Sequence, residues 1–445
     1  MQAGRGFWLG LIAKTRRFST DETGSGTVFG LFVFLAMAAI GGLAIDVTHA
    51  YSERTRLQVA ADVAGHAALF HRRSMSSDDA KVAAINLVQS TMPQSRFGDF
   101  IRPSDFEFGT YDYVQRSFVA DPASRKAIRV NTGRLQERGN PIESFVSQLI
   151  GRDSWDVRTS SVFVGFLPPC FREGFTAEGP VLVSSNNLYL NGFCIHSNTR
   201  VSVNSNNLFE PGTAVSMPNL DLLKIPASGF TKNAGLGAAL KTEKQDIREI
   251  RHLPDIIANL SKPGSPHYPS YLTSSAVINL SQNKYTPLDF TPGRIHRIAC
   301  SGATATIDPH ATQAVIRNAV ILTSCDVKVG NGLALENAVI ATTNTAQKAI
   351  SGSNSFRLGR IDNCQPGGGA QLLAIGGVSF SSNMQMHGGQ IITQGDVTFS
   401  SLATGRGASI IAGGKIDGTS NMEMMACDEL GMEGNLHIDH YRLAE

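Results

Sequence analysis

Six cysteines are the residues of this sequence with the clearest capacity for chemistry, and all lie in the last two thirds of the chain. None belongs to a C-x-x-C pair, which excludes a zinc ribbon and a thioredoxin-like redox site. An even number is typical of disulfides in an oxidising compartment, and free buried thiols are the alternative. The spacing suggests three pairs, although six cysteines also allow other pairings: Cys170 with Cys194, Cys300 with Cys325, and Cys364 with Cys427.

Other combinations of reactive side chains are weaker. His437, Asp439 and His440 could bind a metal, but a flexible tail with incidental histidines is the simpler interpretation. Asp308 and His310 flank a proline and have no nucleophile nearby, which favours a turn. Several methionines recur with the repeats described below and favour an internal stack over a copper site: Met384, Met386, Met422, Met424 and Met425.

Carboxylates are sparse between Cys300 and Cys427, and none forms an adjacent pair of acids such as glycoside cleavage would use. Residues in neighbouring repeats can still meet without any sequence signal. The formal charge of +2 and the absence of a basic block argue against a nucleic-acid partner. We therefore expect a non-enzymatic protein with no cofactor, and a polysaccharide lyase or hydrolase is a weaker alternative.

One long helical pattern near the N-terminus comes before all six cysteines. We expect it to form a transmembrane and stalk helix over residues 26–72. No charge lies between Glu22 and Asp46, a stretch long enough to cross a bilayer. Small residues in that stretch could pack against partner helices, and Asp46 could pair with a partner's cation; alternatively the small residues only dilute a lipid-facing helix. The predicted packing positions are Gly30, Ala38, Gly41, Gly42 and Asp46.

Charge on either side of the apolar run predicts its orientation. Only Arg54 and Arg56 follow the run closely, whereas four basic residues precede it: Arg5, Lys14, Arg16 and Arg17. This asymmetry places residues 1–25 in the cytoplasm and exports the rest. A cleaved signal peptide is the alternative, but the run is longer than a usual signal core and the helix continues past it.

The segment DETGSGTVFGLFVFLAMAAIGGLAIDVTHAYSERTRLQVAADVAGHAAL resembles the N-terminal segment of the TadE/TadG-like proteins of the Tad (Flp) pilus assembly system. The resemblance includes Asp46, Tyr51 and the run from Arg56 to Ala68. Pilin-like members carry a Glu where this chain has Phe29 or Leu31, so cleavage and filament packing are not expected, and the TadG-like branch is more similar.

This resemblance implies a structural or accessory component that links the inner membrane to the exported, periplasmic apparatus. Its partners would be other Tad pilus assembly proteins of the inner membrane and periplasm, and its N-terminal helix could form homo- or hetero-oligomers. A surface adhesin or glycan-binding module is the alternative function.

Residues 73–168 are expected to form a small α+β module. A capped helix from Ser76 ends before Pro93, strands follow near 106–113 and 127–130, a helix opens at Pro141 and runs to Ile150, and a last strand covers 155–164. Pro168 and Pro169 then mark a boundary.

The last part of the chain, residues 169–445, contains internal repeats. SNNL at 185 recurs at 205, NAVI at 318 recurs at 337, and SNM at 382 recurs at 420. Short strands that end in Gly or Asn lie between the echoes, which predicts a mainly-β parallel β-solenoid (β-helix). A β-sandwich or β-barrel is the alternative. An insertion at about 220–290 is expected to be either a partner-binding surface or a solvated loop.

Overall fold

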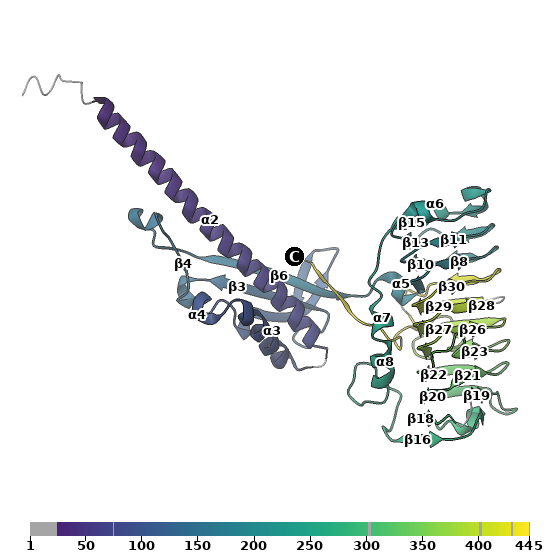
Figure 1. Cartoon of the computed structure of the whole chain (residues 1–445). Helices are drawn as coiled ribbons and strands as arrows, with labels where there is room; N and C mark the ends of the chain where they lie inside the picture. The colour runs from purple at the N-terminus through teal and green to yellow at the C-terminus, as the bar shows by residue number, and fades with distance from the viewer. Residues whose placement is uncertain (1–24, 74, 301–303, 400–402, 429, 445) are drawn as a thin grey trace, which may run out of the picture. The chain divides into compact units, whose positions relative to one another are not determined.

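The computed structural model describes residues 25–73, 75–300, 304–399, 403–428 and 430–444. The predicted cytoplasmic segment at 1–25 therefore lies outside the described residues, except for its last residue. The chain divides into two compact units (Figure 1): unit 1 is residues 1–165 with 441–445, and unit 2 is residues 166–440. The C-terminal residues return to unit 1 because β32 (His440–Leu443) is hydrogen-bonded beside β6 (Val157–Phe166) in the sheet.

Helix α2 (Ser25–His71) is continuous, as the sequence predicts. Its first half carries exposed apolar side chains, such as Phe32 at 66% and Ile40 at 70% exposure. In its second half, Leu57, Ala61 and Ala64 are completely buried. Among the described residues it is the one helix long and apolar enough to cross a membrane.

Unit 1 is built around the buried half of this helix. A sheet in the order β2-β1-β3-β6-β32 packs against it through β3, and α3 also packs on α2. Phe106, Phe108 and Ile128 of the sheet share one core with Leu57. The other elements of unit 1 are α3 (Ser77–Thr91), α4 (Gln94–Phe97), η1 (Pro103–Asp105), β1 (Phe106–Asp112), β2 (Ser117–Ala120), β3 (Ala127–Arg134), η2 (Gln136–Arg138), β4 (Ile142–Glu143), η3 (Ser147–Ile150) and β5 (Ser154–Trp155).

The predicted helix near Ser76 is confirmed, but the one from Pro141 to Ile150 is wrong. The Ser76 hydroxyl caps α3 by accepting the Asp79 N–H at 3.2 Å. Residues 141–150 instead form β4, a loop and the single turn η3. A helix is prevented there because main-chain N–H groups of the loop bond the carboxylate of Asp46, as described below.

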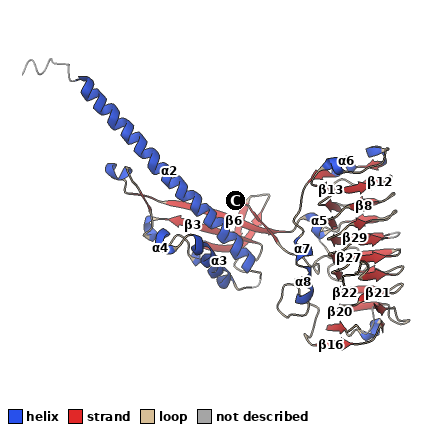
Figure 2. Cartoon of the chain, viewed as in Figure 1, coloured by secondary structure: helices blue, strands red, loops and turns tan. Residues whose placement is uncertain are grey.

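Unit 2 is mostly β, and its strands form two parallel sheets whose layers follow one another in Figure 2. One sheet has the path β14-β12-β9-β31-β29-β27-β24-β22-β20-β18-β16 with side branches, and the other has the order β11-β8-β30-β28-β26-β23-β21-β19-β17.

The elements of the first half of unit 2 are α5 (Pro169–Arg172), β7 (Gly174–Ala177), β8 (Val181–Val183), β9 (Leu188–Leu190), β10 (Cys194–Ser197), β11 (Val201–Val203), β12 (Asn207–Phe209), β13 (Ala214–Met217), η4 (Leu220–Leu222), η5 (Gly229–Lys232), β14 (Asn233–Ala234), α6 (Leu236–Ala239), β15 (Leu240–Thr242), α7 (Arg248–Arg251) and α8 (Leu253–Asn259). Those of the second half are β16 (Val277–Leu280), β17 (Lys284–Tyr285), η6 (Pro287–Asp289), β18 (Arg294–Ile298), β19 (Thr304–Ile307), β20 (Val315–Thr323), β21 (Asp326–Val329), β22 (Ala334–Thr342), β23 (Ile350–Gly352), β24 (Arg357–Leu358), β25 (Ala370–Ala374), β26 (Val378–Phe380), β27 (Met384–Thr393), β28 (Val397–Phe399), β29 (Ala403–Ala412), β30 (Ile416–Asp417) and β31 (Glu423–Met425).

The sequence echoes coincide with the register of these sheets. Position 315 pairs with 334, 384 with 403, and 174 with 194. One Asn of each echoed motif has a positive φ, a left-handed conformation that Asn tolerates better than most residues: Asn186, Asn206, Asn318, Asn337, Asn383 and Asn421. The repeated Asn residues are therefore turns at equivalent places in successive layers.

Buried side chains also line up between layers. Asn207 donates from Nδ2 to Oδ1 of Asn233 at 3.0 Å, and its own Oδ1 accepts the Asn187 N–H at 3.0 Å. Phe380 is stacked between two other rings, with centroids 5.7 Å from Phe356 and 6.0 Å from Phe399. Asn187, Asn207 and Asn233 therefore form a hydrogen-bonded ladder across successive layers.

The layers do not follow chain order. β29 pairs with β27 on one side and with β7 on the other, β30 pairs with β8, and β31 pairs with β9. The first strands of unit 2 therefore dock on its last strands, and this seam lies within the sheets rather than at an edge. Across it, the Ser409 hydroxyl donates to the Phe171 carbonyl at 2.8 Å.

The predicted insertion at about 220–290 includes the connection between the two ends of the sheets. This connection runs from β15 to β16, and both strands lie within the predicted range. Its helices α7 and α8 run beside the strands (Figure 1), and α7 contacts β27 and β29. Leu253, Ile256 and Leu260 are buried against an apolar outward face of the sheet that includes Val339 and Ile392. The segment therefore covers an apolar face of the sheet and does not extend away from a single layer.

The segment that contains His437 is also packed, so the expected flexible tail is wrong. Leu436 and Ile438 are buried on the same outward face of the sheet. The side-chain amide of Gln390 donates to the Leu436 carbonyl and accepts the Leu436 N–H. Glu249 accepts the Ile438 N–H at 3.0 Å.

The buried carboxyl of Glu173 makes the stability of the seam depend on pH. It is 5% exposed and accepts a hydrogen bond from the Cys427 N–H, and burial raises its pKa from 4.5 to about 7. Because the folded state binds this proton more tightly than the unfolded state, the stabilising contribution is complete below pH 4.5 and is lost as the pH rises to about 7.

We predict that Glu173→Gln leaves stability unchanged below pH 4.5 and raises the free energy of unfolding of unit 2 by up to about 3 kcal/mol at about pH 8. Denaturant titrations across this range measure the difference, with the exposed Glu243→Gln as the matched control. A gain that does not depend on pH would contradict this assignment.

Candidate functional site

The apolar half of α2 and the loop that contacts its middle are the most distinctive site in the described chain. Gly30, Ala38 and Gly41, three of the predicted packing residues, are exposed on α2. A Cβ built at Gly30 or Gly41 meets no atom within 4 Å. These three positions therefore lie on a surface that is open in the monomer.

Gly42 and Asp46, the other two predicted residues, contact a loop of their own chain. The Asp46 carboxylate accepts the N–H groups of Phe145 at 2.7 Å and of Ser147 at 2.6 Å, and the Ser147 hydroxyl at 2.6 Å. A Cβ at position 42 would overlap Val146. Asp46 is 2% exposed, so the structure gives it an intrachain partner where the sequence suggested a partner's cation.

A buried ion pair lies farther along α2. Glu53, which is 2% exposed, bonds Nη1 of Arg134 at 3.0 Å and Nη1 of Arg56 at 2.5 Å. Arg134 also donates to the carbonyls of Asn140 and Pro141, at 3.1 and 3.0 Å. The guanidinium therefore ties α2 to the start of the segment that carries the loop.

A second ion pair lies just before that segment. Both Nη atoms of Arg138 bond Asp105, at 2.8 and 2.7 Å, and this bidentate contact raises the pKa of Arg138. The loop at 144–150 thus projects from a rigid base.

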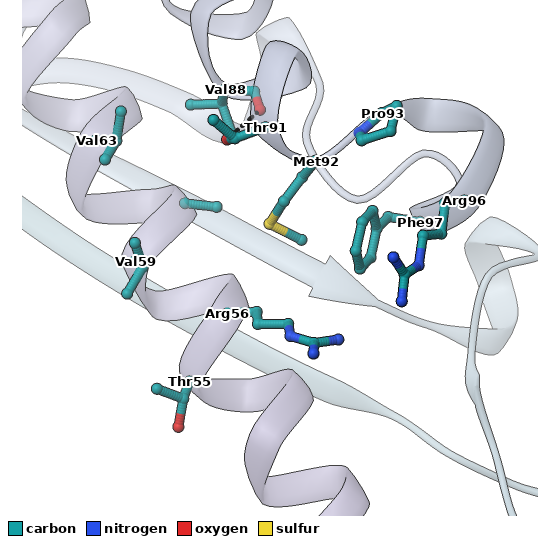
Figure 3. Close-up of a pocket in the computed structure, with 11 residues that line it drawn as sticks. Thr55, Arg56, Val59, Val63, Val88, Thr91, Met92, Pro93, Arg96 and Phe97 are labelled. Carbon is teal, nitrogen blue, oxygen red and sulfur yellow. Dashed lines mark hydrogen bonds between the residues drawn. The ribbon is translucent and has the colours of Figure 1, made fainter.

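An apolar groove of about 480 Å³ lies between α2 and the α3–α4 region (Figure 3). Val59 and Val63 are on the α2 side, and Met92 and Phe97 are on the other. The guanidinium of Arg96 lies 5.3 Å from the Phe97 ring. The groove has the chemistry to accept apolar side chains, and its lining contains no pair of acid and base suited to catalysis.

The six cysteines form three disulfides in unit 2, in the pairs that the spacing suggested: Cys170–Cys194, Cys300–Cys325 and Cys364–Cys427. The first and third join segments close to the seam. Cys170 is in α5, near the start of unit 2, and Cys427 follows β31, near its end. Each end is therefore bonded to another segment of the same unit.

The other candidate sites are structural. Met384, Met386, Met422 and Met424 are buried in the core between the sheets. His437 bonds Asp439 at 3.3 Å, whereas the His440 ring lies against Phe171. Among the described residues, no group of three or more His, Cys, Asp and Glu side chains is placed to hold a metal ion.

Sequence reasoning missed the loop residues Val146 and Ser147. Asp46 was identified as unusual because it ends an uncharged run, but its partners are about one hundred residues away. The available signal was the apolar stretch that contains Phe145, Leu149 and Ile150, but the sequence pattern there predicts a helix.

Two family models match the chain. Residues 174–428, most of unit 2, match the family described as "Domain of unknown function (DUF7867)". The chain belongs to this family. Residues 24–76 match the family described as "Putative Flp pilus-assembly TadE/G-like", which covers α2 and suggests involvement in Flp pilus assembly. Neither a curated protein nor a solved structure matches the chain. In this DUF7867 protein, the resemblance of the N-terminal segment to a Tad-like family is therefore confirmed.

We predict that Asp46→Ala releases the loop, because the main-chain N–H groups of residues 145 and 147 lose their acceptor. Hydrogen exchange measured by mass spectrometry should become faster in peptides that cover 144–151, while residues 57–69 keep their protection. Asp78→Ala on α3 is the matched control, since that side chain is 92% exposed. Unchanged exchange in the loop would show that Asp46 does not hold it.

Proposed function

We propose that this protein is a membrane-anchored structural component of Flp pilus assembly that links the inner membrane to the exported apparatus. The observation that carries the proposal is the match of residues 24–76 to the TadE/G-like family, on a helix that is apolar and exposed in one half and buried in a folded unit in the other. A helix of this kind joins a bilayer to a folded domain without a flexible linker.

The proposed topology is a single pass with a cytoplasmic N-terminus and with both units in the periplasm. The excess of basic residues before the apolar run supports this orientation. Three disulfides in unit 2 agree with an oxidising compartment. The absence of a Glu at Phe29 and Leu31 supports a retained TadG-like anchor over a processed pilin.

Unit 2 is proposed to be a parallel β-solenoid that acts as a rigid arm. The support is the parallel pairing of the strands, with an offset of 19 residues between several layers, and the stacked Asn and Phe side chains. Partners would be other Tad pilus assembly proteins, with Gly30, Ala38 and Gly41 available for helix packing in a homo- or hetero-oligomer.

No reaction or cofactor is assigned. The acid Glu336 illustrates why: it is held by Arg317 at 2.9 Å and by Arg357 at 2.7 Å, an arrangement that ties neighbouring layers together. Such fully paired carboxylates support a structural role for unit 2.

A glycan-binding adhesin is the second candidate function. A cavity of about 530 Å³ in unit 2 is lined by Tyr268, Tyr271, Glu433 and His437. Within the described part of the chain, the buried hydroxyl of Tyr271 has no hydrogen-bond partner. Aromatic rings beside polar groups suit a sugar ligand.

Deletion of the gene should abolish assembled Flp pili, and the wild-type gene should restore them. Complementation with Gly41→Leu should restore fewer pili than complementation with Val114→Leu, which changes an exposed residue of unit 1. Electron microscopy of the cells measures the outcome. Normal pili in the deletion strain would overturn the assembly role, and normal pili with lost surface attachment would favour the adhesin.

A further inference from the structure

We propose that the loop of residues 144–150 inserts apolar side chains into the surface of the lipid bilayer beside α2. The inference rests on the proposed function, in which the apolar half of α2 spans a membrane. Phe145, Leu149 and Ile150 are 55%, 82% and 83% exposed, unlike the apolar residues that unit 1 buries around α2. Three such residues within six positions form an apolar tip that the described residues of unit 1 leave more than half exposed, although the His49 ring lies 4.9 Å from that of Phe145.

The loop lies at the depth where the apolar run of α2 ends. Asp46 is the first charged residue after Glu22, and it binds the main chain of the loop directly. Val146 packs on Gly42, one helical turn nearer the N-terminus, within the uncharged run. The contact therefore fixes the loop at the boundary between hydrocarbon and headgroups.

Lipid is the occupant that the surroundings favour. The loop adjoins exposed apolar residues of α2 itself, because Leu43, Ile45 and Val47 are each at least half exposed around the contact. The loop tip and the helix thus form one continuous apolar surface. A bilayer that covers the helix also covers the tip.

The main chain of the loop is suited to a poorly hydrated environment. Asp46 accepts the N–H groups of residues 145–147, and three of the N–H groups that follow are bonded within the turn: Leu149 to Val146, Gly151 to Gln148, and Arg152 to Ser147. Because unpaired main-chain groups are costly in lipid, this local pairing lowers the cost of insertion.

The residues that follow have the character of a membrane interface. The Arg152 guanidinium lies 3.6 Å from the centre of the Trp155 ring, and Trp155 follows the apolar tip by a few residues. Trp and Arg are typical of the headgroup level, where an amphipathic ring and a cation both find partners. The loop would act as a second, shallow contact that fixes the rotation and tilt of unit 1 on the membrane.

Full-length protein with a cysteine-linked environment-sensitive fluorophore, reconstituted in vesicles of phosphatidylethanolamine and phosphatidylglycerol, tests the proposal. The labelled variant is Leu149→Cys, and Val114→Cys, which is 94% exposed in the turn between β1 and β2, is the control. At position 149 we expect blue-shifted emission and quenching by spin-labelled acyl chains. At position 114 we expect quenching only by a water-soluble quencher.

A third variant, Leu35→Cys in the apolar half of α2, separates this inference from the anchoring role. Lipid quenching at positions 35 and 149 supports the inserted loop. Quenching at 35 but not at 149 overturns the loop insertion and leaves the membrane anchor standing. Absence of lipid quenching at both positions overturns both.

Discussion

The fold of unit 1 depends on the burial of one face of α2 after its apolar run ends. Leu57, Ala61 and Ala64 are completely buried, and the small side chains at positions 61 and 64 allow close packing. A Cβ on Gly65 would lie 3.1 Å from the Phe163 ring, tighter than an ordinary contact. Without this helix, the sheet face that carries Phe106 and Ile128 would be exposed to water, at a cost of roughly 25 cal/mol per Å² of apolar surface. The exposed apolar run and the buried face in the core of unit 1 therefore belong to one helix.

Unit 2 depends on a different constraint, the parallel pairing of its strands. The spacing between layers varies, from 19 residues between Val315 and Ala334 to 32 between Ala338 and Ala370. Parallel pairing still places equivalent side chains above one another, so polar Asn and aromatic Phe residues can be buried in stacks. The seam between β7 and β29 then brings the start of the unit to its last strands. The rings of Phe166 and His440, at the two ends of unit 2, lie 5.8 Å apart.

Local signals predicted much of this architecture. The uncharged run before Asp46 and the alanine pattern from Leu57 predicted α2, and Ser76 predicted the start of α3. The repeated Asn residues predicted parallel layers because their left-handed turns recur at each one. The cysteine spacing suggested the disulfide pairs because two pairs are separated by little more than one repeat.

The missed features all depend on contacts that are distant in sequence. Residues 141–150 have helical composition, but Asp46 binds their main chain across about one hundred positions. The bond from Met422 N–H to Asn187 at the seam spans 235 positions, and no repeat signal indicates that early layers dock on late ones. The tail near His437 looked solvated because its burial depends on Gln390 and Glu249, which lie far along the chain.

The central claim is that one unbroken helix is both the membrane span and the core of unit 1. Pulsed electron paramagnetic resonance of the full-length protein in lipid nanodiscs, with spin labels at Phe32→Cys and Val63→Cys, tests it most directly, since both side chains are exposed. At about 1.5 Å per residue, a continuous helix predicts one narrow distribution of distances between the labels, centred at about 46 Å. A broad or clearly shorter distribution would show a break between the two halves and would contradict the account.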